Sequence, residues 1–176
     1  DSVEDEIQAV MDSKAPGGQL SLVPTDGLPR PIGQDVGRVE VHTDCLDTYV
    51  DFLRSTIPGD LSGIRVVVDC GHGAAYQVTP RVLRELGADV ISLYDEPDGI
   101  NINVACGSTH PQAVAAAVKE YEADVGLAHD GDADRVIAID EKGNIIDGDY
   151  IMVICALHLM EQGKLNENHI AVTVYS

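Results

Sequence analysis

Tryptophan is absent from this sequence of 176 residues, and aromatic residues make up only 4% of it. Because 44% of the residues are nevertheless hydrophobic, a buried core has to be built mainly from valine, isoleucine, leucine and alanine. Such cores are typical of parallel sheets that are covered by helices. The length allows one complete domain with additional segments.

Basic residues are also scarce. Lysine and arginine together number 11 against 30 aspartates and glutamates, which gives a formal net charge of -19. Nucleic acids and anionic membranes are bound through clustered positive charge, so the composition excludes both as partners. Most of the acidic side chains are expected to contribute only solubility.

Cysteine occurs four times, at Cys45, Cys70, Cys106 and Cys155, and never as a CxxC pair. This spacing argues against a zinc site or a disulfide framework, and it favours buried, reduced thiols in a cytoplasmic protein. No apolar run approaches the roughly 20 residues of a membrane span, and no signal peptide is recognised. The sequence starts in a helix-like run and stops in a strand-like run, so we expect it to be part of a longer chain.

Proline and glycine are dense between residues 15 and 38, which places a domain boundary near residue 42. Elsewhere helical and strand patterns alternate, which predicts a three-layer α/β/α domain with a mostly parallel, mixed sheet. The predicted helices are 1–12, 43–57, 76–86, 110–121 and 148–162. The predicted strands are 64–70, 89–94, 124–129, 135–140, 145–146 and 170–175.

Helix starts are predicted from residues that suit an N-cap. Thr43 is expected to cap the helix over 43–57. Thr109 is expected to cap the helix that follows it, with Pro111 in the first turn and Gln112 at capping-box spacing. Asp147 and Asp149 are expected to cap the helix that begins near Gly148.

The most informative motif is DGDADR, residues 130–135. Asp130, Asp132 and Asp134 alternate with small residues, and three carboxylates this close repel one another at neutral pH. A chain that keeps them together usually neutralises them with a cation, and carboxylate oxygens favour Mg²⁺ or Ca²⁺ over zinc. Arg135 follows directly and is suited to a phosphate oxygen.

Three other interpretations of this loop remain open. The first is an EF-hand, since the three aspartates and Glu141 fall at its ligand positions. Against it, Arg135 occupies the position that needs glycine, and both flanks are strand-like rather than helical. The second is a solvated acidic turn without a metal, and the third is a purely structural cation.

Several segments resemble the α-D-phosphohexomutases, enzymes that move phosphate between two positions of a sugar through a phosphoserine and Mg²⁺. The run GLAHDGDADRVIAID is similar to their metal-binding loop. The resemblance extends to DCGHGAA at 69–75, DGININVACGSTHP at 98–111 and DEKGNIIDGDYIM at 140–152, and to the linker-like LPRPIGQDVGRV at 28–39. It implies that residues 1–42 end a first domain and its linker, that 43–168 form the metal-binding second domain, and that 169–176 begin a third.

The resemblance also implies roles for single residues. Asp130, Asp132 and Asp134 are the expected metal ligands, with Mg²⁺ as the cofactor and Mn²⁺ as a substitute. Arg135 is the expected catalytic arginine beside the phosphoserine. That serine lies in a TASHNP-like loop that has no counterpart here, and the sugar and phosphate loops of the later domains are likewise missing. The chain alone is therefore predicted to be inactive and to bind a cation only weakly.

Other residues receive structural interpretations first. Gly71 to Ala74 follow a strand and open a helix, so they form either a tight turn or an anion site made of backbone amides. His72 and His129 are candidates for the second shell of the metal, although a single histidine is more often a hydrogen-bonded structural residue. Asn101 and Asn103 are expected to shape their own loop.

The ININ and GSTHP segments favour the branch of the family that interconverts glucosamine 6-phosphate and glucosamine 1-phosphate, as for cell-wall precursors. Relatives that act on mannose or glucose phosphates are the alternative, and a non-catalytic Ca²⁺-binding module is the alternative of another class. The expected partner is a phosphosugar bound through the missing domains, and the family often forms homodimers.

Overall fold

The structure, a computed structural model, describes residues 2–12 and 33–173. The chain divides into two units, Asp1–Val41 and His42–Ser176. The first contains α1 (Ser2–Asp12), which confirms the predicted acidic helix, and the short 3-10 helix η1 (Gly33–Asp35). Most of the predicted linker over 15–38 lies outside the described residues.

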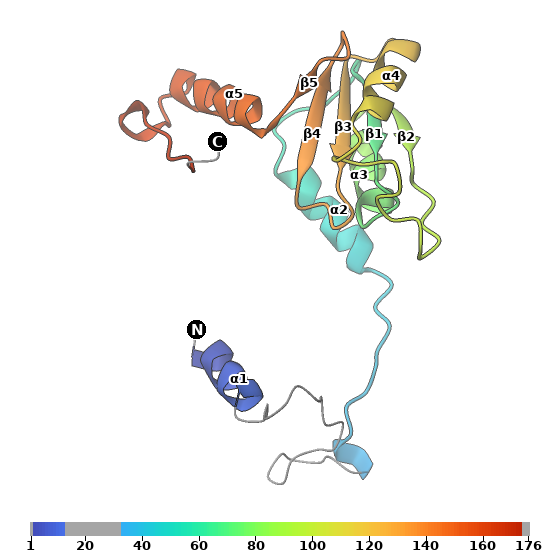
Figure 1. The fold of residues 1–176 in the computed structure, drawn as a ribbon, viewed down its shortest axis with the longest axis vertical. Coiled ribbons are helices and arrows are strands. Elements are labelled where there is room, and N and C mark those ends of the chain that lie inside the picture. Colours follow the sequence, from blue (N-terminus) through green and yellow to red (C-terminus); the bar gives the residue numbers. More distant parts are fainter. Residues whose placement is uncertain (1, 13–32, 174–176) are drawn as a thin grey trace. The chain divides into compact units, whose positions relative to one another are not determined.

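A sheet of five strands forms the centre of the second unit (Figure 1). Its order is β2-β1-β3-β4-β5, in which β1 is parallel to β2 and β3, while β3–β4 and β4–β5 are antiparallel. The α/β fold with a mixed sheet is therefore confirmed, and its parallel part is the β2-β1-β3 half. The strands are β1 (Arg65–Asp69), β2 (Asp89–Leu93), β3 (Val125–His129), β4 (Val136–Asp140) and β5 (Ile145–Ile146).

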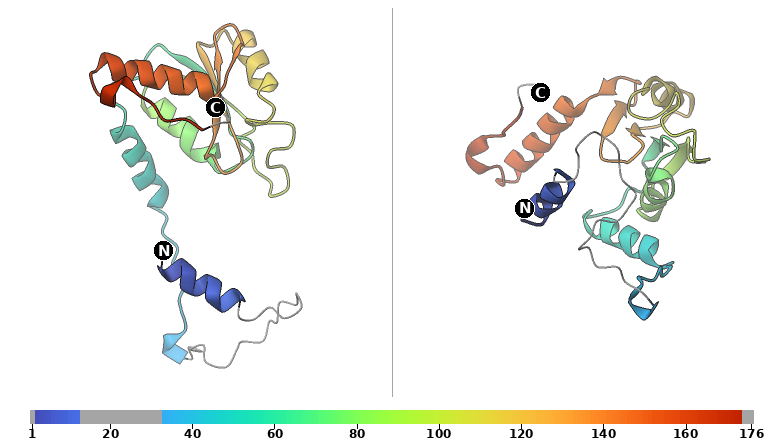
Figure 2. Two further views of the ribbon diagram at one scale, coloured as in Figure 1. Left: turned by 60° about the vertical axis from the view of Figure 1, so that its left-hand side comes forward. Right: turned by 60° about the horizontal axis from the view of Figure 1, so that its bottom comes forward.

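Helices α3 (Ala75–Glu85) and α4 (Gln112–Glu120) cover opposite faces of this sheet (Figure 1 and Figure 2). The alternation of side chains along β1 produces the two faces. Val67 packs with Val114 and Val118 of α4, whereas Val68 packs with Ala75 of α3. Helix α2 (Cys45–Ser55) packs against α3 through Val50. The core is aliphatic, as the scarcity of aromatic residues predicts.

The helix boundaries correct two of the three cap predictions. Asp44, not Thr43, precedes α2, and Pro111, not Thr109, precedes α4; in the described structure neither helix has a side-chain cap. The Thr109 hydroxyl instead lies 3.1 Å from Nδ1 of His110. Asp147 does cap α5 (Gly148–Glu161), because its carboxylate accepts bonds from the amides of Asp149 and Tyr150. Asp149, the other predicted cap, lies in the first turn of the helix instead.

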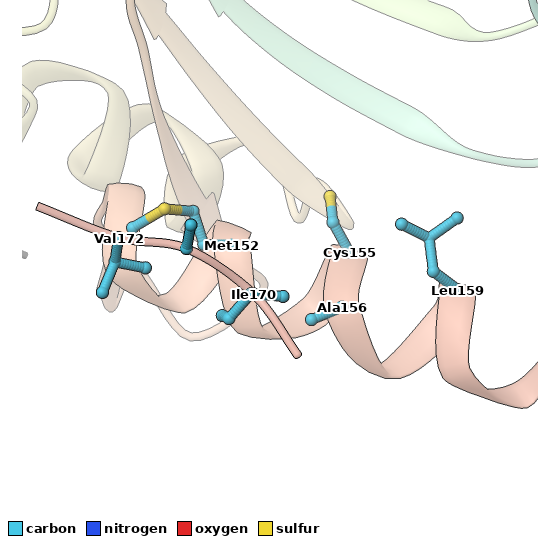
Figure 3. Close-up of a pocket in the computed structure, with 7 residues that line it drawn as sticks. Met152, Cys155, Ala156, Leu159, Ile170 and Val172 are labelled. Atoms are coloured by element: carbon cyan, nitrogen blue, oxygen red, sulfur yellow. The ribbon is translucent and has the colours of Figure 1, made fainter. Parts of the chain in front are cut away.

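The last helix differs from the others in its exposure. Among the described residues of α5 none is buried, although the helix is largely apolar. The predicted strand over 170–175 is not found in its described part, 170–173, which carries no regular structure. This stretch and α5 line an apolar pocket of about 340 Å³, formed by Met152, Cys155, Ala156, Leu159, Ile170, Ala171 and Val172 (Figure 3). In the described part of the chain, no helix combines the length and apolarity that a membrane span requires.

The cysteines are all free, but only two of them are buried, so the prediction of four buried thiols is half wrong. Cys70 and Cys106 lie in the interior, while Cys45 on α2 and Cys155 on α5 are exposed. Burial, together with the negative charges of Asp95 and Asp69, raises the pKa of Cys70 to about 12. A thiol with that pKa is almost fully protonated at pH 8 and reacts slowly, because the thiolate is the nucleophile.

Ellman's reagent at pH 8 should therefore modify two thiols of the native chain quickly and the other two only after denaturation. Cys45→Ser and Cys155→Ser should each remove one fast thiol. A native chain in which all four thiols react at the same rate would contradict the burial of Cys70 and Cys106.

Candidate metal centre

The loops that follow β1, β2 and β3 emerge at one end of the sheet, because these three strands are parallel. From β1 the chain proceeds through α3 to β2 on one side, and it returns through α4 to β3 on the other side. The topology therefore switches between β1 and β3. Crevices outside the carboxyl ends of strands at such a switch point are the usual ligand sites of open α/β sheets.

The acidic loop connects β3 to β4 in the sequence, and it starts at the end of β3 that lies beside this switch point. Asp130 is 3% exposed, whereas Asp132 and Asp134 are exposed. One carboxylate oxygen from each of the three lies within 4.8 Å of the others, which makes them a group able to hold a metal ion. Ala133 turns the loop with a positive φ of 60°. The structure thus brings together the three residues that the sequence suggests as ligands.

Arg135 is placed against the same carboxylates. Its Nε and Nη2 atoms each lie 2.7 Å from Oδ2 of Asp130, and Nε lies 3.3 Å from Oδ1 of Asp134. Its backbone amide donates to Oδ1 of Asp130 at 3.1 Å. The guanidinium nonetheless has an exposed side, because the side chain is 71% exposed. Arg135 therefore neutralises part of the acidic group in this arrangement.

The electrostatics of the loop separate Asp130 from Asp134. Burial alone would raise the pKa of Asp130, but bonds from the Arg135 amide and from Asp134, and the Arg135 charge, lower it overall. The hydrogen bond with Asp130 raises the pKa of Asp134, and the negative charge of Asp132 adds to that rise. A cation would relieve this crowding, as the sequence argument expects.

The loops after β1 and β3 approach each other closely enough to require glycine. A Cβ atom on Gly73 would overlap the carbonyl oxygen of Gly131, and it would lie 2.6 Å from the Gly131 Cα. The amide of Ala74 donates to that same carbonyl oxygen at 2.8 Å. Position 73 therefore requires glycine, because the backbone of the acidic loop leaves no room for a Cβ atom.

The turn from Gly71 to Ala74 does not provide a free set of amides. The His72 amide donates to the carbonyl oxygen of Tyr94, that of Gly73 to Cys70, and that of Ala74 to Gly131. These amides are already used in backbone bonds, so the anion-site interpretation of this turn is wrong. The tight-turn interpretation holds, with His72 itself at a positive φ of 49°.

The two histidines proposed for the surroundings of the metal have buried ring atoms. The His72 ring contacts the Tyr94 ring edge-on, with centroids 5.4 Å apart. Its Nδ1 atom and both ring nitrogens of His129 are buried without a hydrogen-bond partner in the described structure. Burial is the main reason that the pKa of His129 is lowered, which disfavours the charged form of the ring. A role for either residue in the second shell of a metal remains a prediction.

Asp69, at the end of β1, is a buried carboxylate that the sequence argument does not single out. It is fully buried and accepts hydrogen bonds from the amides of Gly71 and Gly107. An aspartate that ends an apolar strand two residues before a glycine is the signal in the sequence. Its second partner lies 38 residues further along the chain, which sequence reasoning on single motifs does not reach.

The neighbouring loop after β2 is shaped in part by Asn101. Its Oδ1 accepts from the amide of Asp98, and its Nδ2 donates to the carbonyl oxygen of Glu96. This confirms the expected local role of Asn101. Asn103 has a positive φ of 58°, and its amide donates to the carbonyl oxygen of Gly71 rather than within its own loop.

The EF-hand interpretation requires helices on both sides of the loop. Strands β3 and β4 flank it instead, and they pair with each other in an antiparallel register from Val125↔Asp140 to His129↔Val136. Glu141 lies beyond the far end of β4, beside the turn into β5. The EF-hand form of the Ca²⁺-binding alternative is therefore wrong.

Comparison with known proteins identifies the family. The family model described as "Phosphoglucomutase/phosphomannomutase, alpha/beta/alpha domain II" matches residues 46–143. The phosphoglucosamine mutase of Desulforamulus reducens is 54% identical over 158 residues, which cover 90% of this chain and 36% of that protein. The phosphoglucosamine mutase of Heliobacterium modesticaldum is 53% identical over 182 residues, which cover 100% of this chain and 40% of that protein. The chain thus spans well under half the length of these relatives.

Solved structures agree with this assignment. A phosphoglucomutase/phosphomannomutase family protein from Burkholderia thailandensis has a TM-score of 0.60 and 30% identity, covering 67% of this chain and 26% of that one. A putative phosphomannomutase from Thermus thermophilus shares the fold, with a TM-score of 0.56 and 20% identity over 67% of this chain and 29% of that one. The family model covers more than half of the sequence, and the fold agrees, so this chain belongs to the phosphoglucomutase/phosphomannomutase family and contains its α/β/α domain II.

Proposed function

We propose that this chain is the metal-binding part of a phosphohexomutase that interconverts glucosamine 6-phosphate and glucosamine 1-phosphate. The observation that carries the proposal is the 53% identity to a phosphoglucosamine mutase over the whole chain, acidic loop included. The activity is assigned to a longer parent protein, because the chain covers only 40% of that relative. The chain alone is expected to supply the metal loop without turnover.

Asp130, Asp132 and Asp134 are the proposed ligands of Mg²⁺, for which Mn²⁺ can substitute. Their oxygens are the hard ligands that these ions prefer, and their spacing fits one ion. When bound, the metal offsets negative charge on the transferring phosphoryl group. The buried Asp130 supplies one fixed ligand, and the exposure of Asp132 and Asp134 leaves the site accessible to a phosphate.

Arg135 is the proposed phosphate-binding arginine of the site. Its Nε and Nη2 atoms are bonded to Asp130, so these two atoms can bind a phosphate oxygen only after that carboxylate is released. The release becomes favourable once a cation neutralises Asp130, so we propose that metal binding and phosphate binding by Arg135 are coupled. The exposure of the side chain gives it room to move.

The exposed apolar side chains of α5 fit a longer parent. Large apolar surfaces on a domain are usually covered by a partner, and relatives of this chain are more than twice as long. We propose that further parts of a cytoplasmic parent cover α5 and supply the phosphoserine and sugar loops. The phosphosugar binds through those parts, and the parent is proposed to be a homodimer that binds neither nucleic acid nor membrane.

A mutase assay on the full-length parent tests the proposal. The phosphates of glucosamine, mannose and glucose are offered side by side with Mg²⁺ to serine-phosphorylated protein. We expect glucosamine phosphate to be converted with the highest kcat/KM. A preference for mannose or glucose phosphate would overturn the substrate, and no turnover of any of the three would overturn the proposed activity.

A further inference from the structure

We infer that Asp69 is a positioning residue of the proposed metal centre, whose buried carboxylate ties the loops after β1 and β2 together and thereby holds the acidic loop in place. The inference rests on the metal binding proposed above. Asp69 and Asp130 are the two buried acidic residues of the described chain, and they lie at the ends of the adjacent strands β1 and β3.

Asp69 uses both of its carboxylate oxygens in this tie. Oδ1 accepts from the amide of Gly71 at 2.7 Å, and Oδ2 accepts from the amide of Gly107 at 2.8 Å. Both glycines have positive φ values, 58° and 75°, so each loop turns sharply at the residue that Asp69 holds. Burial raises the pKa of Asp69 overall, and the bonds from the Gly107 and Gly71 amides oppose that rise because they favour the charged carboxylate. Bonds to a charged carboxylate are stronger than bonds between neutral groups.

The two tied loops in turn hold the acidic loop by backbone bonds. From the loop after β1, the Ala74 amide donates to the carbonyl oxygen of Gly131 at 2.8 Å. From the loop after β2, the Ser108 amide donates to the carbonyl oxygen of His129 at 2.9 Å. These carbonyl groups lie immediately before and after Asp130. Asp69 is therefore connected to both neighbours of the buried ligand, through the loop after β1 to Gly131 and through the loop after β2 to His129.

The close packing at this point leaves little room for adjustment. A Cβ atom on Gly107 would lie 2.6 Å from the carbonyl oxygen of His129, and one on Gly71 would lie 3.3 Å from the same atom. Movement of either loop is therefore passed to the acidic loop by direct contact. Among the described hydrogen bonds of Asp69 none goes to a proposed ligand, so its effect on the metal is exerted through position.

Asp69→Asn isolates this role because it conserves the size of the side chain. The amide group keeps one acceptor oxygen but presents an N–H donor to the second backbone N–H, so one of the two ties is lost. Asp140→Asn is the matched control. Asp140 also accepts from backbone amides, those of Lys142 and Asn144, but in the turn between β4 and β5.

The experiment measures the affinity of the 176-residue chain for Mn²⁺ by electron paramagnetic resonance of the free ion. Outer-shell substitutions typically weaken metal binding about 10- to 100-fold, and we expect Asp69→Asn to fall in that range. Asp140→Asn should bind Mn²⁺ as the unchanged chain does, even though it loosens a turn. Circular dichroism establishes that each variant is folded, which separates positioning from a general loss of stability.

A second measurement needs no variant and no metal. Amide hydrogen exchange of the unchanged chain should show the Gly71, Ala74, Gly107 and Ser108 amides opening together, with equal free energies of opening. Independent opening of Ala74 and Ser108 would overturn the inference even if Asp69→Asn failed to fold.

The two proposals fail in different ways. If the unchanged chain takes up no Mn²⁺ at millimolar concentration, the metal site itself is wrong and the positioning role falls with it. If the unchanged chain binds Mn²⁺ and folded Asp69→Asn binds it equally well, only the positioning role is overturned.

Discussion

Gly73→Ala should destabilise the second unit by about 3 kcal/mol, at the upper end of the cost of overpacking a tight interior. The new methyl group would overlap the carbonyl oxygen of Gly131 and approach its Cα to 2.6 Å. These are backbone atoms, so the contact cannot be relieved by rotation of a side chain. The loops after β1 and β3 have to separate, and the Ala74–Gly131 hydrogen bond lengthens as they do.

The size of this effect is set by sterics and not by backbone conformation. The φ value of Gly73 is not in the positive range, so alanine can adopt it without strain. Urea unfolding followed by circular dichroism measures the loss of stability. The same separation of loops should weaken Mn²⁺ binding, because it moves the backbone next to Asp130.

Gly148→Ala is the matched control for this substitution. Gly148 is the first residue of α5, and in the described structure a Cβ atom there would meet no atom within 4 Å. Alanine favours a helix over glycine, so this variant should be as stable as the unchanged chain or slightly more stable. Equal urea midpoints for Gly73→Ala and Gly148→Ala would contradict the close approach of the two loops.

Much of this fold could be predicted from the sequence because local patterns coincide with tertiary structure. The valine-rich run before Asp69 is a fully buried strand, and the turn at Lys142-Gly143-Asn144 produces the predicted hairpin. The spacing of strands and helices is enough to predict an α/β fold. Each of these signals is contained within a short window of the chain.

The errors arise where a second partner decides the outcome. Thr109 has the chemistry of a helix cap, but its hydroxyl lies next to His110 instead. The pattern of residues 170–173 suits a strand, but in the described chain no neighbouring strand pairs with it. In both cases the residues suit the predicted structure, but contacts with other parts of the chain decide which structure forms.

The candidate metal centre shows the same division. Asp130, Asp132 and Asp134 could be found because they are adjacent in sequence. Asp69 could not be found in this way, because its role depends on an amide from the loop after another strand. The pairing of Arg135 with Asp130 was likewise not predictable, since the sequence says only that a cation follows the acidic group.

Asp132→Asn should weaken Mn²⁺ binding by the 176-residue chain on the order of a hundredfold, because the charge and number of ligands tune affinity over several decades. Asp132 is the best of the three proposed ligands for this test. Asp130 is buried and bonded to Arg135, and Asp134 is also bonded to it, so substituting either would disturb the loop. Asp132 is exposed and has no such bond among the described contacts.

The same substitution should leave the stability of the metal-free chain unchanged or slightly higher. The negative charge of Asp132 contributes to the raised pKa of Asp134, after the larger contribution of the hydrogen bond with Asp130. Removing that charge relieves repulsion and lowers the pKa of Asp134 towards its usual value. Asp132→Asn should therefore weaken Mn²⁺ binding without lowering the stability of the metal-free chain. A variant that was simply unfolded would lose both.

Glu141→Gln provides the control for net charge. It removes the same single charge from an exposed side chain in the turn after β4. We expect it to bind Mn²⁺ like the unchanged chain, because Glu141 lies at the far end of β4 from the acidic loop. Equal Mn²⁺ titrations for Asp132→Asn and the unchanged chain would remove Asp132 from the site. An equal loss in both variants would instead show that the cation responds to the net charge of the chain and not to a built site.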